Sequence, residues 1–130
     1  MVLQEEIFEK AHYDIIVAGG GVGGAAAAVQ AAREGKHVLL VEKSQKLGGL
    51  ATLGLVNVFV PMCNGRGKQI IFGMAEEMLR LAIKYGYGGI NPAFENGRIP
   101  EEKLAEYKAN GHQPPRYMTK FSAEIFALTL

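Results

Sequence analysis

The sequence predicts an α/β chain built on a parallel sheet. Two short apolar runs, residues 13–18 and 37–41, are continuous rather than alternating, which is typical of strands buried on both faces. Between them lies a stretch of strong helix formers, residues 25–33, and a cluster of glycines separates this stretch from the first run. A strand, a glycine-rich turn, a helix and a second strand within about 30 residues form a βαβ unit, whose two strands are parallel.

The rest of the chain predicts a long loop followed by three helices. Residues 44–68 are rich in glycine, which favours a long loop with short strand pieces. Residues 70–85 repeat their apolar side chains at helical spacing. The buried face of this helix would carry Ile71, Met74, Met78, Leu81 and Tyr85. A short polar helix is expected at residues 101–108, and a last helix at residues 119–130.

Length and composition restrict the class of protein. The 130 residues are enough for one domain, and 48% of them are hydrophobic, too many for a disordered chain. The 14 Lys and Arg residues balance 13 Asp and Glu residues, so the basic surface of a nucleic-acid-binding protein is absent. No apolar stretch approaches the ~20 residues of a membrane span. We therefore expect a cytoplasmic protein that binds neither nucleic acid nor membrane.

The most specific motif is a run of six residues that we call the glycine turn: Gly19, Gly20, Gly21, Val22, Gly23 and Gly24. It contains G-x-G-x-x-G and lies between a predicted strand and a predicted helix, the context in which this motif binds dinucleotides. Gly19 permits a tight turn, Gly21 lets the backbone approach a pyrophosphate, and Gly24 lets the helix pack closely on the strand. The helix N-terminus adds free N–H groups for the phosphates. The alternative is a turn with no ligand.

An acidic residue, Glu42, closes the second strand. It lies 18 residues beyond Gly24, near the ~20-residue offset at which a carboxylate binds the adenosine ribose. A carboxylate there accepts hydrogen bonds from ribose hydroxyls and repels a 2′-phosphate, which disfavours NADP. Glu42 alone is also compatible with a solvated strand end. Together with the glycine turn, it predicts a Rossmann-like FAD/NAD(P)-binding fold with a parallel sheet.

A second glycine pair, Gly48-Gly49, follows Glu42 and precedes the run ATLGLV of residues 51–56. An acid followed by such a pair resembles the flavoprotein superfamily with the glutathione-reductase-type FAD-binding fold. Within it, the run GLATLGLVNVFVPMCNGRGKQIIFGMAEEMLRL is similar to FAD-dependent oxidoreductases related to fumarate reductase flavoproteins. The likeness covers about residues 13–90.

The resemblance implies FAD as the cofactor and indicates which residues contact it. The adenosine would be held by the glycine turn together with Glu42 and Lys43. The pyrophosphate, ribityl chain and flavin ring would lie along Gly48, Gly49 and Thr52. Glycine N–H groups can reach phosphate oxygens because no Cβ stands in the way.

The residues that are missing narrow the chemistry. Relatives that reduce disulfides carry a cysteine pair after the Gly-Gly, whereas Cys63 is the only cysteine here and is expected to be a small loop hydrophobe. Some fumarate reductase relatives attach FAD through a histidine in this segment, but none occurs between His37 and His112. We therefore expect non-covalent FAD, no disulfide reduction and no metal site. Arg66 and Lys68 leave two alternatives open: they neutralise a phosphate or an anionic substrate, or they form a solvated turn.

Family members run several hundred residues, so the resemblance implies an incomplete domain. Residues 13–130 would be the N-terminal part of an FAD-binding domain, after an arm at residues 1–12. Two strands leave open sheet edges, which predicts a homo-oligomer or a partner chain that covers them. The parent would be a flavin-dependent oxidoreductase that exchanges hydride or electrons with an unidentified small molecule, and the catalytic groups remain unknown. We expect this chain alone to be inactive.

Two alternatives to the flavin-binding interpretation are kept. An NAD-binding Rossmann domain explains the glycine turn and Glu42 equally well, but it does not explain the Gly48-Gly49 pair. A non-catalytic, truncated remnant that acts as an interaction module predicts exposed apolar strands and no retained flavin.

Overall fold

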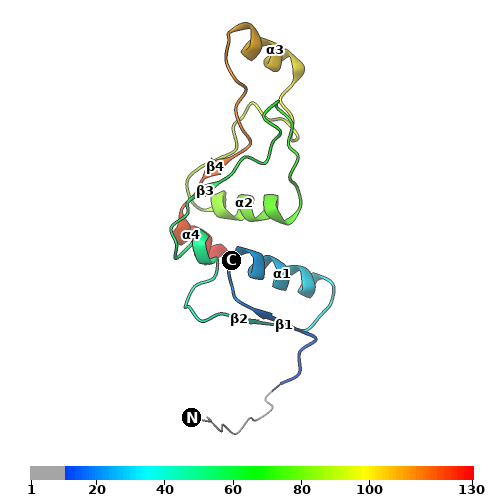
Figure 1. Cartoon of the computed structure of the whole chain (residues 1–130), viewed down its shortest axis with the longest axis vertical. Coiled ribbons are helices and arrows are strands. Elements are labelled where there is room, and N and C mark those ends of the chain that lie inside the picture. The colour runs from blue at the N-terminus through cyan, green and yellow to red at the C-terminus, as the bar shows by residue number, and fades with distance from the viewer. Residues whose placement is uncertain (1–10) are drawn as a thin grey trace, which may run out of the picture.

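The predicted βαβ unit is present in the computed structural model, which describes residues 11–130. Strands β1, Ile15–Ala18, and β2, Val38–Val41, pair in parallel with Ile15 opposite Val38. Helix α1, Val22–Arg33, packs on both strands. Figure 1 shows this unit at one end of an elongated molecule. The α/β class with a parallel sheet is confirmed, and residues 1–10 of the predicted arm lie outside the described residues.

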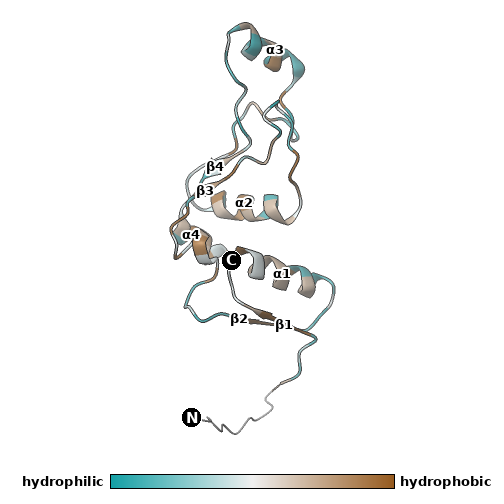
Figure 2. Cartoon of the chain, in the orientation of Figure 1, coloured by the Kyte–Doolittle hydropathy of each residue, from teal (hydrophilic) through white to brown (hydrophobic). Residues whose placement is uncertain are grey.

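The two strands are not buried on both faces, so that expectation from their continuous apolar sequence was wrong. Ile16 is 64% exposed and Val41 is 49% exposed. The sheet has only these two strands within residues 11–130, and α1 covers one of its sides. Figure 2 shows the pair as a strongly apolar element with α1 on one side and, within the described residues, no helix on the other. Its apolar side chains therefore meet solvent.

Helix α2 is shorter than the predicted helix of residues 70–85 and spans Met74–Lys84. Gly73 takes φ = +66°, a left-handed conformation that separates the helix from the residues before it. Ile71 and Tyr85 consequently lie outside the helix and are 42% and 68% exposed, which corrects their predicted place on the buried face. Met78 is buried as predicted.

The predicted last helix of residues 119–130 divides into a strand and a helix. Strand β4, Thr119–Lys120, pairs antiparallel with β3, Val58–Phe59, and α4 spans Ala123–Thr129. Ser122 fixes the start of α4, because its hydroxyl accepts a hydrogen bond from the backbone N–H three residues on. Helix α3, Glu101–Ala109, agrees with the predicted short polar helix and contains no buried residue.

None of the helices formed by residues 11–130 combines the length and the apolar character needed to cross a lipid bilayer.

Two clusters of buried side chains hold the elements together, with α2 between them. The first contains Met78, Ala82, Phe121 and Phe126. Partly buried residues of α1 and of the short 3₁₀ helix η1, Gly49–Ala51, pack against it. The second cluster contains Met62, Cys63, Leu79 and Tyr117. The first cluster therefore joins the βαβ unit to α2 and α4, and the buried Cys63 confirms its interpretation as a small hydrophobe.

Candidate functional site: the glycine turn and the second glycine pair

The glycine turn links β1 to α1 with the geometry that its motif predicts. Gly19 has φ = +105°, a conformation that favours glycine. A Cβ on Gly24 would overlap the carbonyl oxygen of Gly19, so only glycine lets α1 begin this close to the strand. A Cβ on Gly21 would meet no heavy atom within 4 Å, so the space in front of this residue is open. The turn is tight at one end, open in the middle and closely packed at the other.

Helix α1 begins at Val22, three residues earlier than predicted, so Gly23 and Gly24 lie in its first turn. The first N–H groups of a helix have no partner inside the helix. Here Gly21 is the N-cap residue, no side chain caps the helix, and its first turn carries no acidic residue. No side chain of α1 itself therefore offsets the positive end of the helix dipole, which favours an anion in front of it.

Glu42 reaches from the end of β2 back to the glycine turn. Its Oε2 accepts a hydrogen bond from the Gly20 N–H at 2.6 Å, and its Oε1 accepts one from the Ser44 N–H at 2.8 Å. These hydrogen bonds, that of Ser44 first, lower the pKa of Glu42 from 4.5 to about 2. The carboxylate is thus ionised at neutral pH, and its remaining lone pairs can accept hydroxyl protons. Sequence reasoning placed Glu42 correctly but did not find its contact with Gly20.

The contribution of Glu42 to stability is expected to depend on pH. Its pKa is lower in the folded state, so the stabilisation is complete above about pH 4.5 and is lost as the pH falls toward about 2. The Glu42→Gln variant should therefore show a flatter decline in the free energy of unfolding across this range than the wild type. Urea unfolding at a series of pH values measures both slopes. Equal slopes would contradict the assignment.

The second glycine pair packs directly against the glycine turn. The Gly48 N–H donates to the Gly20 carbonyl at 2.8 Å, and Gly48 and Gly21 pair as an isolated parallel bridge. Gly48 and Gly49 take φ values of +93° and +50°. A Cβ on Gly49 would lie 3.2 Å from the Cα of Gly21. Two motifs that are separated in the sequence therefore form one surface of bare backbone.

The buried side chain of Thr52 packs beside Gly48. It is only 4% exposed, and its hydroxyl donates to the carbonyl oxygen of Leu47. A Cβ on Gly48 would overlap the Thr52 side chain, so a residue larger than glycine at position 48 would clash with Thr52. Lys43, beside Glu42, is exposed. Contacts of Thr52 and Lys43 with a cofactor stay predictions.

Arg66 and Lys68 are not brought to the glycine turn. Both are exposed, and Lys68 forms an isolated bridge with Arg98, in the loop before α3. Gly67 between them faces Ile99 and Leu104, since a Cβ on this glycine would meet both side chains. Of the two alternatives, the structure favours a solvated turn.

Comparison with known proteins gives the family of the chain. A family model described as FAD dependent oxidoreductase matches residues 14–120, which include the glycine turn, Glu42 and the second glycine pair. The chain belongs to the FAD-dependent oxidoreductase family. FAD is the cofactor of this family, which confirms the prediction from the two glycine motifs. No solved structure matches the chain.

Several curated relatives of this FAD-dependent oxidoreductase chain are reductases or dehydrogenases. The 4-oxocyclohexanecarboxylate 2-dehydrogenase of Sinomonas cyclohexanicum is 30% identical over 109 residues, 84% of this chain and 17% of that protein. Thioredoxin reductase of Ureaplasma parvum is 33% identical over 58% of this chain and 24% of its own length. Digeranylgeranylglycerophospholipid reductase 2 of Methanococcoides burtonii is 56% identical over 30% of this chain and 10% of its own length. The chain thus spans a quarter or less of these relatives.

The residues of this FAD-dependent oxidoreductase chain fit the cofactor. The open space before Gly21 and the uncapped N-terminus of α1 suit a pyrophosphate, since a side chain at Gly21 would fill that space. The ionised carboxylate of Glu42 suits the hydroxyl groups of a ribose.

Proposed function

We propose that this chain provides the adenosine and pyrophosphate part of a non-covalent FAD site in a flavin-dependent oxidoreductase. The hydrogen bond from the Gly48 N–H to the Gly20 carbonyl carries the proposal, because it brings the second glycine pair against the glycine turn. FAD, when bound, supplies hydride or electron-pair chemistry toward a small molecule. An NAD-binding domain needs the turn and the acid, but it gives no role to Gly48 and Gly49.

Each part of the site has a role in this proposal. The N-terminus of α1 and the bare backbone at Gly21 bind the pyrophosphate, and Glu42 holds the adenosine ribose by accepting its hydroxyl protons. The names of the curated relatives point to different substrates, among them a lipid and a cyclohexane carboxylate. The part they share with this chain therefore serves the cofactor rather than the substrate.

The test is cofactor retention. The chain is incubated with FAD and passed through gel filtration, and absorbance near ~450 nm reports the bound flavin. Glu42→Ala should weaken FAD binding about tenfold or more, because charge-assisted hydrogen bonds to the ribose are lost. The matched control is Glu106→Ala on α3, which removes an exposed carboxylate and should leave the affinity unchanged. A wild-type chain that binds NAD more tightly than FAD, or equal losses in both variants, would contradict the proposal.

We further propose that a second copy or a partner chain covers the open sheet of β1 and β2, in the cytoplasm. The exposed Ile16 and Val41 support a covering partner, and the single free Cys63 is typical of a reducing compartment. The same gel filtration reports the mass of the flavin-bound species. A second copy predicts a dimer that dissociates on dilution. A colourless chain that self-associates would instead favour an interaction module without catalytic activity.

A further inference from the structure

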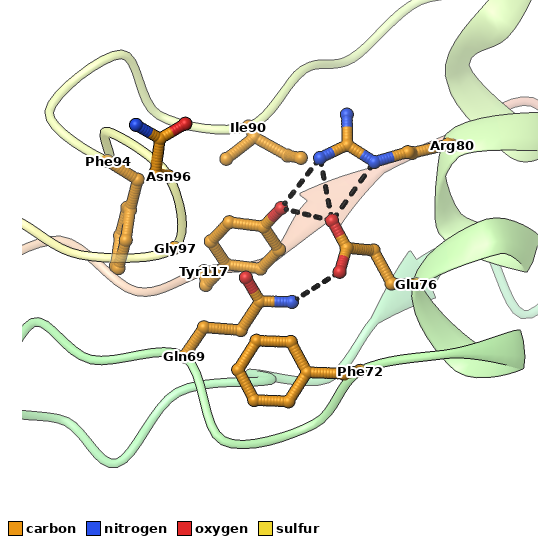
Figure 3. Close-up of a pocket in the computed structure, with 9 residues that line it drawn as sticks. All are labelled: Gln69, Phe72, Glu76, Arg80, Ile90, Phe94, Asn96, Gly97 and Tyr117. Carbon is orange, nitrogen blue, oxygen red and sulfur yellow. Dashed lines mark hydrogen bonds and ion pairs between the residues drawn. The ribbon is translucent and has the colours of Figure 1, made fainter.

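A cavity lies between α2 and the loop of residues 90–97, and no residue of the glycine turn lines it. Its volume is about 400 Å³, within the range of small-molecule sites. Figure 3 shows Glu76 and Arg80 on one wall, with Phe94 and Asn96 opposite them. Glu76 and Arg80 are the two charged residues that line this cavity. The cavity lining therefore carries no net charge.

The carboxylate of Glu76 accepts four hydrogen bonds from the protein. Its Oε1 accepts from Arg80 Nη2 at 2.6 Å, Arg80 Nε at 3.0 Å and the Tyr117 hydroxyl at 3.1 Å. Its Oε2 accepts from the side-chain amide of Gln69 at 2.7 Å. Burial raises the pKa of Glu76, but the hydrogen bonds from Arg80, Gln69 and Tyr117 outweigh burial and keep it below its usual value. Glu76 is therefore ionised and holds Gln69, Arg80 and Tyr117 in place by hydrogen bonds. A ligand carboxylate beside it would be repelled.

Gln69 leaves one hydrogen-bond acceptor open toward the cavity. The residue is only 3% exposed. Its Nε2 donates to the Ile71 carbonyl at 2.9 Å as well as to Glu76. Both partners are acceptors, so this end of the amide must be the nitrogen and the other end the oxygen. Gln69 Oε1 accepts no hydrogen bond from the described residues. Among these residues, every side-chain nitrogen or oxygen that is fully covered has a hydrogen-bond partner. Gln69 Oε1 is therefore still accessible.

The absent side chain of Gly97 keeps that oxygen accessible. A Cβ on Gly97 would lie 2.7 Å from Gln69 Oε1, and the backbone of Gly97 accepts a 2.8 Å hydrogen bond from the Gln69 N–H. The loop is thus fixed to Gln69, and a side chain at position 97 would clash with this oxygen. Figure 3 shows the Gln69 amide with its nitrogen turned toward Glu76 and its oxygen turned away from it.

Donors and aromatic surfaces complete the cavity. Arg80 uses Nε and Nη2 on Glu76, while its Nη1 has no hydrogen bond to any described residue. The side-chain amide of Asn96 is likewise unused within residues 11–130 and exposed. Phe94 packs edge-on against Tyr117 at a centroid distance of 5.1 Å, and Phe72 at the opening is 59% exposed. The walls therefore offer the buried acceptor of Gln69, the exposed amide of Asn96, a donor of Arg80 and flat apolar faces.

We propose that this cavity binds a planar, uncharged ring that carries a carboxamide edge. The N–H of the carboxamide donates to Gln69 Oε1, its carbonyl oxygen accepts from Arg80 or Asn96, and the ring packs on Phe72 and Phe94. An uncharged ligand matches the compensated Glu76–Arg80 pair, and the paired donor and acceptor match a carboxamide. The site is separate from the proposed FAD site and goes beyond it.

Three probes of equal size test this chemistry: benzamide, benzoate and acetophenone. Benzamide has the N–H donor and the carbonyl, benzoate has a charge and no donor, and acetophenone has the carbonyl alone. Titration of the 130-residue chain, followed by amide NMR signals, gives the three dissociation constants. Benzamide should bind about tenfold more tightly than either analogue, with shifts at Gly97 and at the Gln69 side chain. Equal affinities, or shifts confined to other regions, would overturn the proposal.

Two variants test the walls of the cavity. Phe72→Ala removes an exposed ring and should weaken benzamide binding several-fold, whereas Tyr87→Ala removes an equally exposed ring that does not line the cavity. Neither variant should change FAD retention, because the glycine turn is untouched, so the two proposals can fail independently. Loss of benzamide binding in both variants, or in neither, would overturn the assignment of the Phe72 wall.

Discussion

The Gly24→Ala variant is expected to lose about 3 kcal/mol of stability and the ability to retain FAD. The added Cβ overlaps the carbonyl oxygen of Gly19, which is backbone and cannot rotate away. Either α1 moves off β1 or the turn at Gly19 opens, and both changes displace the N–H groups that we propose bind the pyrophosphate. The measurements are urea unfolding and absorbance of the flavin retained after gel filtration.

The neighbouring glycine provides the matched control. Gly23 lies in the same first turn of α1, and a Cβ on it would meet no heavy atom within 4 Å. Gly23→Ala should therefore stabilise the chain by up to about 1 kcal/mol, since alanine is the better helix former. Two adjacent, chemically identical substitutions are thus expected to shift the free energy of unfolding in opposite directions. Shifts of the same sign and size would contradict the close packing of Gly24 on Gly19.

The Phe126→Ala variant is expected to lose about 3–5 kcal/mol of folding stability. It removes one ring from the aromatic cluster of Phe59, Phe121 and Phe126. Phe126 is fully buried, and its ring lies 5.3 Å from that of Phe121 and 6.2 Å from that of Phe59, centroid to centroid. Partly buried residues of α1 and η1 pack against the same cluster. The variant should therefore also loosen the βαβ unit from α2, which hydrogen exchange of the amides in α1 would detect.

Leu128→Ala is the control on the same helix. Leu128 is 84% exposed, so its truncation should change the free energy of unfolding by no more than about 0.5 kcal/mol. Thermal unfolding of the two variants measures the difference. A small effect of Phe126→Ala, comparable with that of Leu128→Ala, would show that α4 does not hold the core together.

The βαβ unit could be predicted because its signals are local. A continuous apolar run, a glycine motif of fixed spacing and an acid at the next strand end each depend on nearby residues, and β1, β2 and Glu42 lie where these signals place them. The contact of Gly48 with Gly20 was not predicted, since the resemblance only assigned both motifs to one cofactor. The start of α1 was missed, because Gly23 and Gly24 are poor helix formers that tertiary packing places in its first turn.

The features that the sequence could not predict depend on distant partners. Strands β3 and β4 have two residues each, too few for any periodicity, and their pairing joins residues 58–59 to residues 119–120. The apolar spacing of residues 70–85 gave no sign that the helix begins only after Gly73. The conformation of Gly73 is set by the turn it makes. The hydrogen bonds of Glu76 with Gln69 and Tyr117 have no signal in spacing, because Tyr117 approaches from another part of the chain.

The two sheets differ in when they can form during synthesis. Ile15 pairs with Val38, so the first ladder can close as soon as β2 has left the ribosome. Val58 pairs with Lys120, so the second ladder must wait until residue 120 has emerged. The glycine turn can therefore assemble on the nascent chain before the cluster around Phe126 forms.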